Sequence, residues 1–284
     1  EECGWMYETL HTDGKTKGKI NFTVWSDVFV CPHCMKDFVF WEAAVDREKG
    51  MVLDEFQCPY CEALLTKRSI ERVYLFLKDD DYKDHNMANE STAYNNHCAL
   101  DTQSDCLVKI AKQVPVLISY TVGSKSFEKR PDNLDIQIIE KINSVKPFYW
   151  YPANELPEGY NTNQPIRSHG FSRIHHFYTN RNLISLSLLN SLAVPHQMKF
   201  MLTGLLNRAT KLNQLHLKNY FFGGGGCNAG HRKGTLYAPS ISIETSIPQL
   251  LKERVKSQWR AYQQNLSSGN CIISCQSLTK KKKK

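Results

Sequence analysis

Four cysteines of the chain occur as two matching pairs. The pairs are residues 31–34 (CPHC) and residues 58–61 (CPYC), and 23 residues separate them. Two residues between the thiols let both sulfurs of a pair reach one ion at about 2.3 Å, and four sulfurs complete a tetrahedral shell. A closed shell leaves no position for a substrate, so the pattern predicts a structural zinc ion. The predicted ligands of this Zn2+ are Cys31, Cys34, Cys58 and Cys61.

Two alternatives to this zinc site are weaker. A thioredoxin-like redox role suits a single Cys-x-x-Cys motif better than a matched pair. A second metal site built from His97 and the cysteines at 98, 106, 271 and 275 would need irregular spacings, so these four residues are expected to be ordinary thiols. His33, inside the first pair, is expected to point to solvent or to phosphate.

Residues 168–181 form a basic and aromatic segment just before an expected helix. The segment holds three histidines, two arginines and three aromatic residues. Cations next to a helix N-terminus suit phosphate, and Phe177 or Tyr178 could fill the gap left by a flipped base. The alternative is that the aromatic residues belong to the core and the histidines are polar packing. The candidate DNA-binding residues, with two from a later loop, are Arg173, His175, Arg181, Asn182, Arg232 and Lys233.

A glycine run follows at residues 222–226 (FGGGG) and formally fits a cofactor-binding Phe-x-Gly-x-Gly motif. Glu244, at the end of an expected strand, lies at a suitable distance to take ribose hydroxyls. However, residues 227–234 (CNAGHRKG) do not favour a helix, and a cofactor loop needs a helix N-terminus behind it. The sequence therefore favours a flexible, basic, glycine-rich loop near DNA.

Hydrophobic periodicity and turn residues predict an α+β fold. A four-cysteine zinc ribbon, which is a small β unit, is expected to precede a mixed, mainly helical region. The expected strands are residues 19–30, 38–45, 51–56, 114–120 and 235–243, and the expected helices are residues 133–144, 180–193, 196–215 and 247–266. The expected divisions are a zinc-ribbon domain at 1–77, a mobile polar loop at 78–112, an α+β DNA-contacting region at 113–270 and a lead-in to a further strand at 271–284.

Composition limits the class of protein. The chain has 284 residues, 41% of them hydrophobic, which excludes disorder along its whole length. Its net charge is +8, of which five charges come from Lys280–Lys284, so any nucleic-acid partner must be recognised by local patches. No apolar stretch reaches the roughly 20 residues of a membrane span, and no signal peptide is recognisable. The paired cysteines favour a reducing cytoplasm.

Four segments resemble the central region of a family of large bacterial site-specific DNA methyltransferases of the amino-methylating type. They are residues 3–9 (CGWMYET), 18–34 (GKINFTVWSDVFVCPHC), 40–46 (FWEAAVD) and 159–183 (GYNTNQPIRSHGFSRIHHFYTNRNL). The resemblance implies duplex DNA as partner, with no membrane, and a S-adenosylmethionine-dependent enzyme that methylates adenine N6 or cytosine N4.

The catalytic parts of that family are not found here in their proper context. The family carries a Phe-x-Gly-x-Gly motif before this region and an Asp-Pro-Pro-Phe/Tyr motif after it, and residues 271–280 (CIISCQSLTK) resemble the lead-in to the catalytic strand. We therefore expect a fragment that lacks the methyltransferase segments of its parent and has no catalytic or cofactor-binding residue. Two rivals stay open: a stand-alone nucleic-acid-binding zinc-ribbon protein without enzymatic activity, and a complete methyltransferase that uses residues 222–226.

Overall fold

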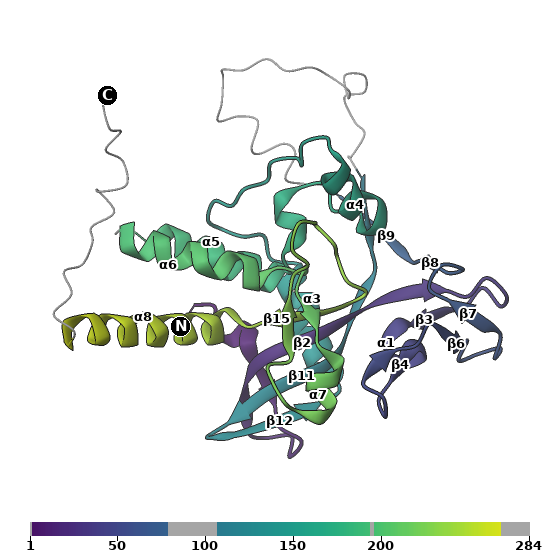
Figure 1. The fold of residues 1–284 in the computed structure, drawn as a ribbon, viewed down its shortest axis with the longest axis horizontal. Coiled ribbons are helices and arrows are strands. Elements are labelled where there is room, and N and C mark those ends of the chain that lie inside the picture. Colours follow the sequence, from purple (N-terminus) through teal and green to yellow (C-terminus); the bar gives the residue numbers. More distant parts are fainter. Residues whose placement is uncertain (1, 79–106, 194–195, 268–284) are drawn as a thin grey trace.

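The computed structural model describes residues 2–78, 107–193 and 196–267 (Figure 1). Most of the predicted mobile loop and the whole predicted lead-in lie outside these residues. His97 and the four cysteines of the disfavoured second metal site also lie outside them.

The centre of the molecule is one long strand, β2 (Lys17–Val30). Strand β11 (Gln113–Val122) pairs with it along one edge and β15 (Ile241–Thr245) along the other. The sheet runs in the order β12-β11-β2-β15-β13-β14, and all of these pairs are antiparallel. The other strands on this path are β12 (Lys125–Lys129), β13 (Gln214–Leu215) and β14 (Asn228–Gly230), and β1 (Glu8–Leu10) also pairs with β2.

Strand β2 is covered on both faces. Successive side chains of a strand point to opposite faces, and residues 26–29 of β2 are all buried. Two of these four residues are polar, Ser26 and Asp27, so the centre of the sheet contains polar groups that need partners.

The far end of β2 enters a small unit of short strands and turns, residues 28–72, called the cysteine unit below. Strands β3 and β8 both pair with the last residues of β2. The elements of the unit are β3 (Asp37–Val39), α1 (Phe40–Ala44), β4 (Val45–Asp46), β5 (Met51–Val52), β6 (Glu55–Gln57), β7 (Leu64–Thr66) and β8 (Glu71–Arg72). The cysteine unit and the central sheet therefore share strand β2.

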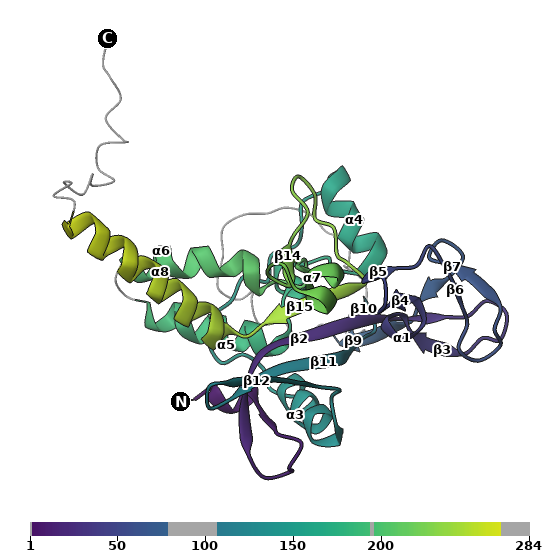
Figure 2. The same ribbon diagram turned by 60° about the horizontal axis from the view of Figure 1, so that its bottom comes forward.

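Helices gather at the opposite end of the molecule, as both Figure 1 and Figure 2 show. There α5 (Asn180–Leu192), α6 (His196–Leu206) and α8 (Ile247–Ser267) pack on the sheet around Ile20, Ile118 and Tyr120. The other helices are α3 (Asn133–Asn143), α4 (Tyr160–His169) and α7 (Leu217–Phe222). An antiparallel pair of strands, β9 (Tyr74–Lys78) and β10 (Leu107–Ala111), extends from the sheet beside α4.

Local signals explain the helices that were predicted correctly. Asp132 caps α3 in a reciprocal capping box with Asp135, and the Thr179 hydroxyl accepts the amide of Asn182 at the start of α5. The mixed fold with antiparallel sheets agrees with the expected α+β class in its coarse form. The strands at 19–30 and 114–120 and the helices at 133–144, 180–193 and 247–266 are confirmed within a few residues.

Other expectations were wrong. Residues 40–44 form helix α1 rather than a strand, the helix from 196 ends at Leu206, and the strand expected at 235–243 begins at Ile241. The sheet also crosses the predicted division at residue 77, because β2 pairs with strands from the second part, and β10 lies inside the predicted loop at 78–112.

None of the helices within the described ranges combines the length and the apolar character that a membrane span requires.

Candidate metal centre and nucleic-acid interface

The four predicted cysteine ligands meet at one point. The Sγ atoms of Cys31 and Cys61 are 3.7 Å apart, and those of Cys34 and Cys58 are 3.8 Å apart. All four sulfurs lie within 4.8 Å of one another. A tetrahedral shell with metal–sulfur bonds of about 2.3 Å puts its sulfurs about 3.8 Å apart, so the spacing fits a four-coordinate thiolate site. The four cysteines can therefore hold a metal ion.

The two cysteine pairs adopt the same backbone turn. In the first, the amide of Met35 donates to the carbonyl oxygen of Cys31, and in the second the amide of Glu62 donates to that of Cys58. Met35 and Glu62 have φ angles of 57° and 59°, in the left-handed region that non-glycine residues rarely adopt. Both cysteine segments adopt this unfavourable left-handed conformation at equivalent positions, which indicates that the turn is needed to orient the sulfurs.

Thiol acidity in the cluster also favours a cation. Burial raises the pKa of Cys31, but hydrogen bonds from the amides of Cys34 and His33 outweigh it and hold the pKa at about 6. At Cys61 the Ala63 amide lowers the pKa, whereas burial and the neighbouring thiols raise it to about 12. Four thiols in contact cannot all ionise unless a positive charge lies among them.

An aromatic cluster packs in the same core as Cys31 and Cys58 of the two cysteine turns. Phe40 packs on Phe29 and Phe56 with ring centroids 5.2 and 5.7 Å apart, and Phe38 lies 6.2 Å from Phe56. Phe29 belongs to β2, so this core is continuous with that of the central sheet. The aromatic core of the cysteine unit is thus shared with the sheet.

Two of the predicted DNA-binding residues, Arg181 and Asn182, lie in the core instead. Arg181 is 5% exposed and Asn182 is fully buried. The Asn182 amide donates to the carbonyl oxygens of Ala209 and Thr245 at 3.1 and 3.3 Å. The burial of both side chains does not favour the predicted contacts with DNA.

Arg181 is part of a buried ion pair with Glu244. Its Nε and one Nη donate to the two carboxylate oxygens at 3.1 and 2.6 Å. Trp25 and Thr179 also donate to this carboxylate. Burial lowers the pKa of Arg181, and the Glu244 charge raises it further than burial lowers it, so the guanidinium remains charged. The pair joins α5 to β15 and β2 at the centre of the fold.

Other residues of the basic and aromatic segment make contacts within the protein. Arg173 donates to the Ala153 carbonyl oxygen and to Glu155, and its side chain is 12% exposed. The half-buried ring of His175 packs against Tyr151 at 5.5 Å. Phe177 is buried against Phe171, at 5.6 Å between ring centroids. The alternative reading of this segment as core and polar packing describes these contacts best.

His176 makes the stability of the folded protein depend on pH. Its Nδ1 accepts the amides of Ser172 and Arg173, each at 3.3 Å, so the fold needs the neutral ring. Burial, then His175 and the cations of Lys211 and Arg173, lower its pKa to about 3. Between pH 6.5 and 3 the unfolded chain therefore binds a proton that the folded chain excludes, and stability falls as the pH falls.

We expect the His176→Asn variant, whose Oδ1 can accept the same amides without titrating, to lack this dependence. Urea unfolding at pH 6.5 and pH 5.0 should show the wild type losing about 1.6 kcal/mol more than the variant, since one pKa unit corresponds to about 1.4 kcal/mol and the unfolded histidine is already half protonated at pH 6.5. His169, whose pKa burial also lowers, contributes equally to both proteins. Equal losses in the two proteins would contradict a neutral His176.

The two remaining DNA-binding candidates, Arg232 and Lys233, are exposed. They lie in a turn between β14 and β15, where the Arg232 guanidinium lies 4.6 Å from the Tyr237 ring centroid. The Thr235 hydroxyl donates to Gln164 of α4 at 2.6 Å, and both views show the loop next to α4. These two cations therefore lie on the same side of the molecule as α4.

The glycine run does not have the geometry of a cofactor loop. It follows helix α7 and leads into strand β14, whereas a cofactor loop leads from a strand into a helix. Glu244, the expected ribose ligand of that alternative, is 4% exposed and engaged by Arg181.

A second buried network, centred on Asp27, holds α4 against the sheet, and the sequence did not predict it. Fully buried Asp27 of β2 accepts hydrogen bonds from Arg72 at 2.7 Å, from Gln113 at 2.9 Å and from His169 of α4 at 3.2 Å. Burial raises the pKa of Asp27, but the His169 hydrogen bond and the Arg72 charge hold it well below its usual range. The only sequence signal is an aspartate inside an apolar strand, which indicates a partner but not its identity.

No protein-family model, curated protein or solved structure matches this chain.

Proposed function

We propose that the chain is the zinc-holding, DNA-binding part of a S-adenosylmethionine-dependent DNA methyltransferase that acts on adenine N6 or cytosine N4. The methyltransferase assignment is supported by the resemblance of residues 3–9, 18–34, 40–46 and 159–183 to that family. The metal in this proposal is Zn2+, which suits a closed shell of four thiolates and has a structural role. Free thiols at all the described cysteines suit a reducing compartment, and we propose the cytoplasm.

The DNA-binding part of the proposal is carried by the exposed face of α4 and the turn beside it. Tyr160, Asn163 and Arg167 are exposed on α4, and the helix contains no acidic residue. Asn and Arg are among the side chains that hydrogen-bond to base edges, while Arg232 and Lys233 supply charge for phosphates. Two acidic residues, Glu155 and Glu158, precede α4 in the sequence, and Arg173 forms an ion pair with Glu155.

The expected result is a salt-dependent affinity for duplex DNA that weakens when these cations are removed. Log affinity should fall against log salt with a slope of about −0.9 per phosphate contacted. Arg232→Ala and Lys233→Ala should each flatten the slope by about one unit, measured by fluorescence anisotropy from 50 to 200 mM salt.

Two lysines of α8 provide the matched control, since Lys252 and Lys256 are exposed on a helix that lies away from α4 in both views. Lys252→Gln and Lys256→Gln should leave the slope unchanged. If all four variants behave alike, the turn beside α4 is not the contact surface. If the wild type shows no salt-dependent binding, the DNA-binding proposal fails.

A stand-alone nucleic-acid-binding protein is the second candidate. It is favoured by the glycine run, which leads into β14 rather than into a helix. Tritium transfer from labelled S-adenosylmethionine to duplex DNA by the full natural polypeptide separates the candidates. Transfer to an exocyclic amine supports the methyltransferase, and DNA binding without transfer supports the second candidate.

A further inference from the structure

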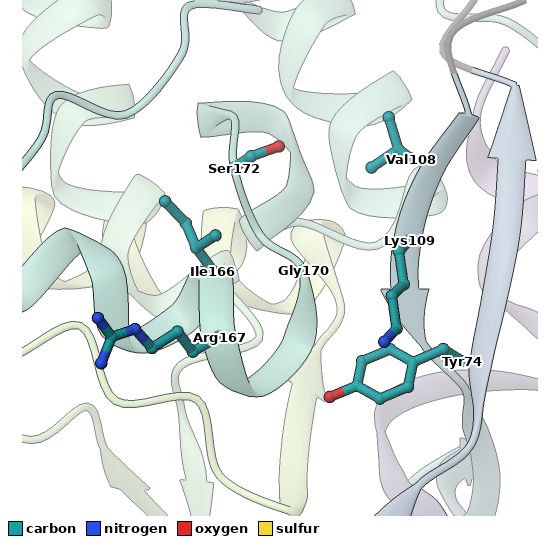
Figure 3. Close-up of a pocket in the computed structure, with 7 residues that line it drawn as sticks. All are labelled: Tyr74, Val108, Lys109, Ile166, Arg167, Gly170 and Ser172. Atoms are coloured by element: carbon teal, nitrogen blue, oxygen red, sulfur yellow. The ribbon is translucent and has the colours of Figure 1, made fainter.

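A cavity and a helix face lie outside the sites described above. The cavity, of about 390 Å³, lies between the β9–β10 pair and the last turn of α4 (Figure 3). Its charged side chains diverge, because Arg167 is directed away from Lys109 and Tyr74. The helix face is the outer side of α8, where exposed side chains of two kinds lie next to one another on a single element.

Helix α8 is anchored to the molecule through its first turns. Leu250 is buried in the helical core, and Arg254 lies against α6, where a Cβ atom on Gly204 would come within 2.7 Å of the guanidinium. Among residues 255–264, only Gln258 is not exposed. Figure 1 and Figure 2 both show the last turns of α8 extending beyond the ends of α5 and α6. The second half of α8 therefore projects from the body of the protein.

An apolar stripe runs along the outer side of this helix. Its members are spaced by four, four and three residues and are Leu251, Val255, Trp259 and Tyr262. At 3.6 residues per turn they fall within a sector of about 80°, which is narrower than a core-facing stripe and typical of the seam between two paired helices. Trp259 is 59% exposed, and its ring centroid lies 5.9 Å from that of Tyr262. Tryptophan and tyrosine are enriched among the residues that dominate binding energy in protein interfaces.

A basic stripe runs beside the apolar one. Lys252, Lys256 and Arg260 repeat every four residues, are exposed, and occupy the adjoining sector of the helix. Within the described ranges none of these three cations forms an ion pair with a carboxylate. The one acidic residue of α8, Glu253, is paired with Arg208 at 3.2 Å. The outer side of α8 therefore presents three cations and no free negative charge.

These features favour a partner helix with acidic flanks over two other occupants. A second copy of α8 would bring three more cations to the interface and no free carboxylate, because Glu253 is already paired. A membrane surface favours a wide apolar face opposite a basic one, whereas here the apolar sector is narrow and the cations adjoin it on one side. An acidic helix supplies apolar side chains for the seam and carboxylates for the basic stripe.

We propose that the outer side of α8 docks an amphipathic helix of a separate partner protein, with apolar residues every three to four positions and Asp or Glu beside them. The apolar seam of that helix packs on Trp259 and Tyr262. Its carboxylates pair with Lys252, Lys256 and Arg260. The inference does not rest on the proposed DNA binding, since α8 lies away from α4 in both views.

The test uses the full natural polypeptide and a labelled synthetic helix of three heptads, with leucine at positions a and d and glutamate at positions e and g. A second peptide carries lysine in place of every glutamate. Fluorescence anisotropy should show saturable binding of the glutamate peptide and about tenfold weaker binding of the lysine peptide. Trp259→Ala should weaken binding of the glutamate peptide about tenfold, whereas Trp150→Ala, at another exposed tryptophan, should bind like wild type.

Charge reversal separates recognition from a loss of folding. Lys252→Glu, Lys256→Glu and Arg260→Glu combined should transfer the preference to the lysine peptide. Lys125→Glu, at an exposed position of β12, should leave the glutamate peptide preferred.

Equal binding of both peptides by the wild type, or binding of neither, would contradict the proposal. Without peptide binding, a dimer in sedimentation that Trp259→Ala dissociates assigns the face to a second copy of the chain. Binding to phosphatidylglycerol vesicles that the same variant abolishes, again without peptide binding, assigns the face to a membrane surface. Either result overturns the partner helix and leaves the proposed DNA binding untouched.

Discussion

Substituting Cys58 with serine should abolish stoichiometric zinc binding and unfold the cysteine unit. Structural zinc sites contribute about 10–16 kcal/mol of apparent binding free energy at pH 7, far more than the short strands of this unit can replace. We expect one zinc per wild-type chain by elemental analysis after purification without chelator, and none in the variant. Cys227→Ser is the control, because Cys227 is a half-buried thiol outside the four-sulfur group.

Hydrogen exchange can locate the damage in the Cys58→Ser protein. The turn amides of Met35 and Glu62 should lose protection, because their bonds exist only in the metal-binding turns. Amides of β2 that pair with β11, such as those near Val24, should stay protected. Full zinc content in the variant, or no zinc in the wild type, would refute the metal site.

The second large effect is expected at the buried ion pair. Arg181→Met should lower the free energy of unfolding by about 3–5 kcal/mol, because it leaves the Glu244 carboxylate buried without its counter-charge. Urea unfolding monitored by circular dichroism measures the loss. Adding Glu244→Gln, which removes the orphaned charge and keeps an acceptor for Trp25, should restore about half of it.

The same variant decides between two roles for Arg181. A residue that contacts phosphate would flatten the salt dependence of DNA binding by about one unit when replaced. We expect no such change in folded Arg181→Met protein. A flattened slope together with a stability loss below about 1 kcal/mol would return Arg181 to the DNA interface.

Features governed by neighbours in sequence were predictable. The cysteine pairs are local turns, and the Asp132 and Thr179 caps lie within three residues of the amides they accept. The clustering of the four cysteines, the long strand β2 and three of the helices therefore followed from the sequence. Helix α1 was missed because aromatic and β-branched residues favour strands, whereas Phe40, Trp41 and Ala44 bury one face of a helix against the sheet.

Features governed by distant partners were not predictable. Arg181 and Glu244 are 63 residues apart, and they meet only because β15 returns to the edge of β2. A cation next to a helix N-terminus can bind a phosphate as well as a carboxylate, so the segment alone could not show which anion Arg181 binds. Arg167, which is exposed on α4, was overlooked because the basic segment was taken to begin at Ser168.

The shared strand β2 has a consequence for how the molecule can be divided. Cutting the chain between the predicted parts would take the central strand away with the cysteine unit and leave β11 and β15 with bare edges. Neither piece would keep its backbone groups paired, and exposed edges of this kind promote aggregation. Each piece therefore needs the other, and the cysteine unit cannot be moved to another protein without the strands that pair with β2.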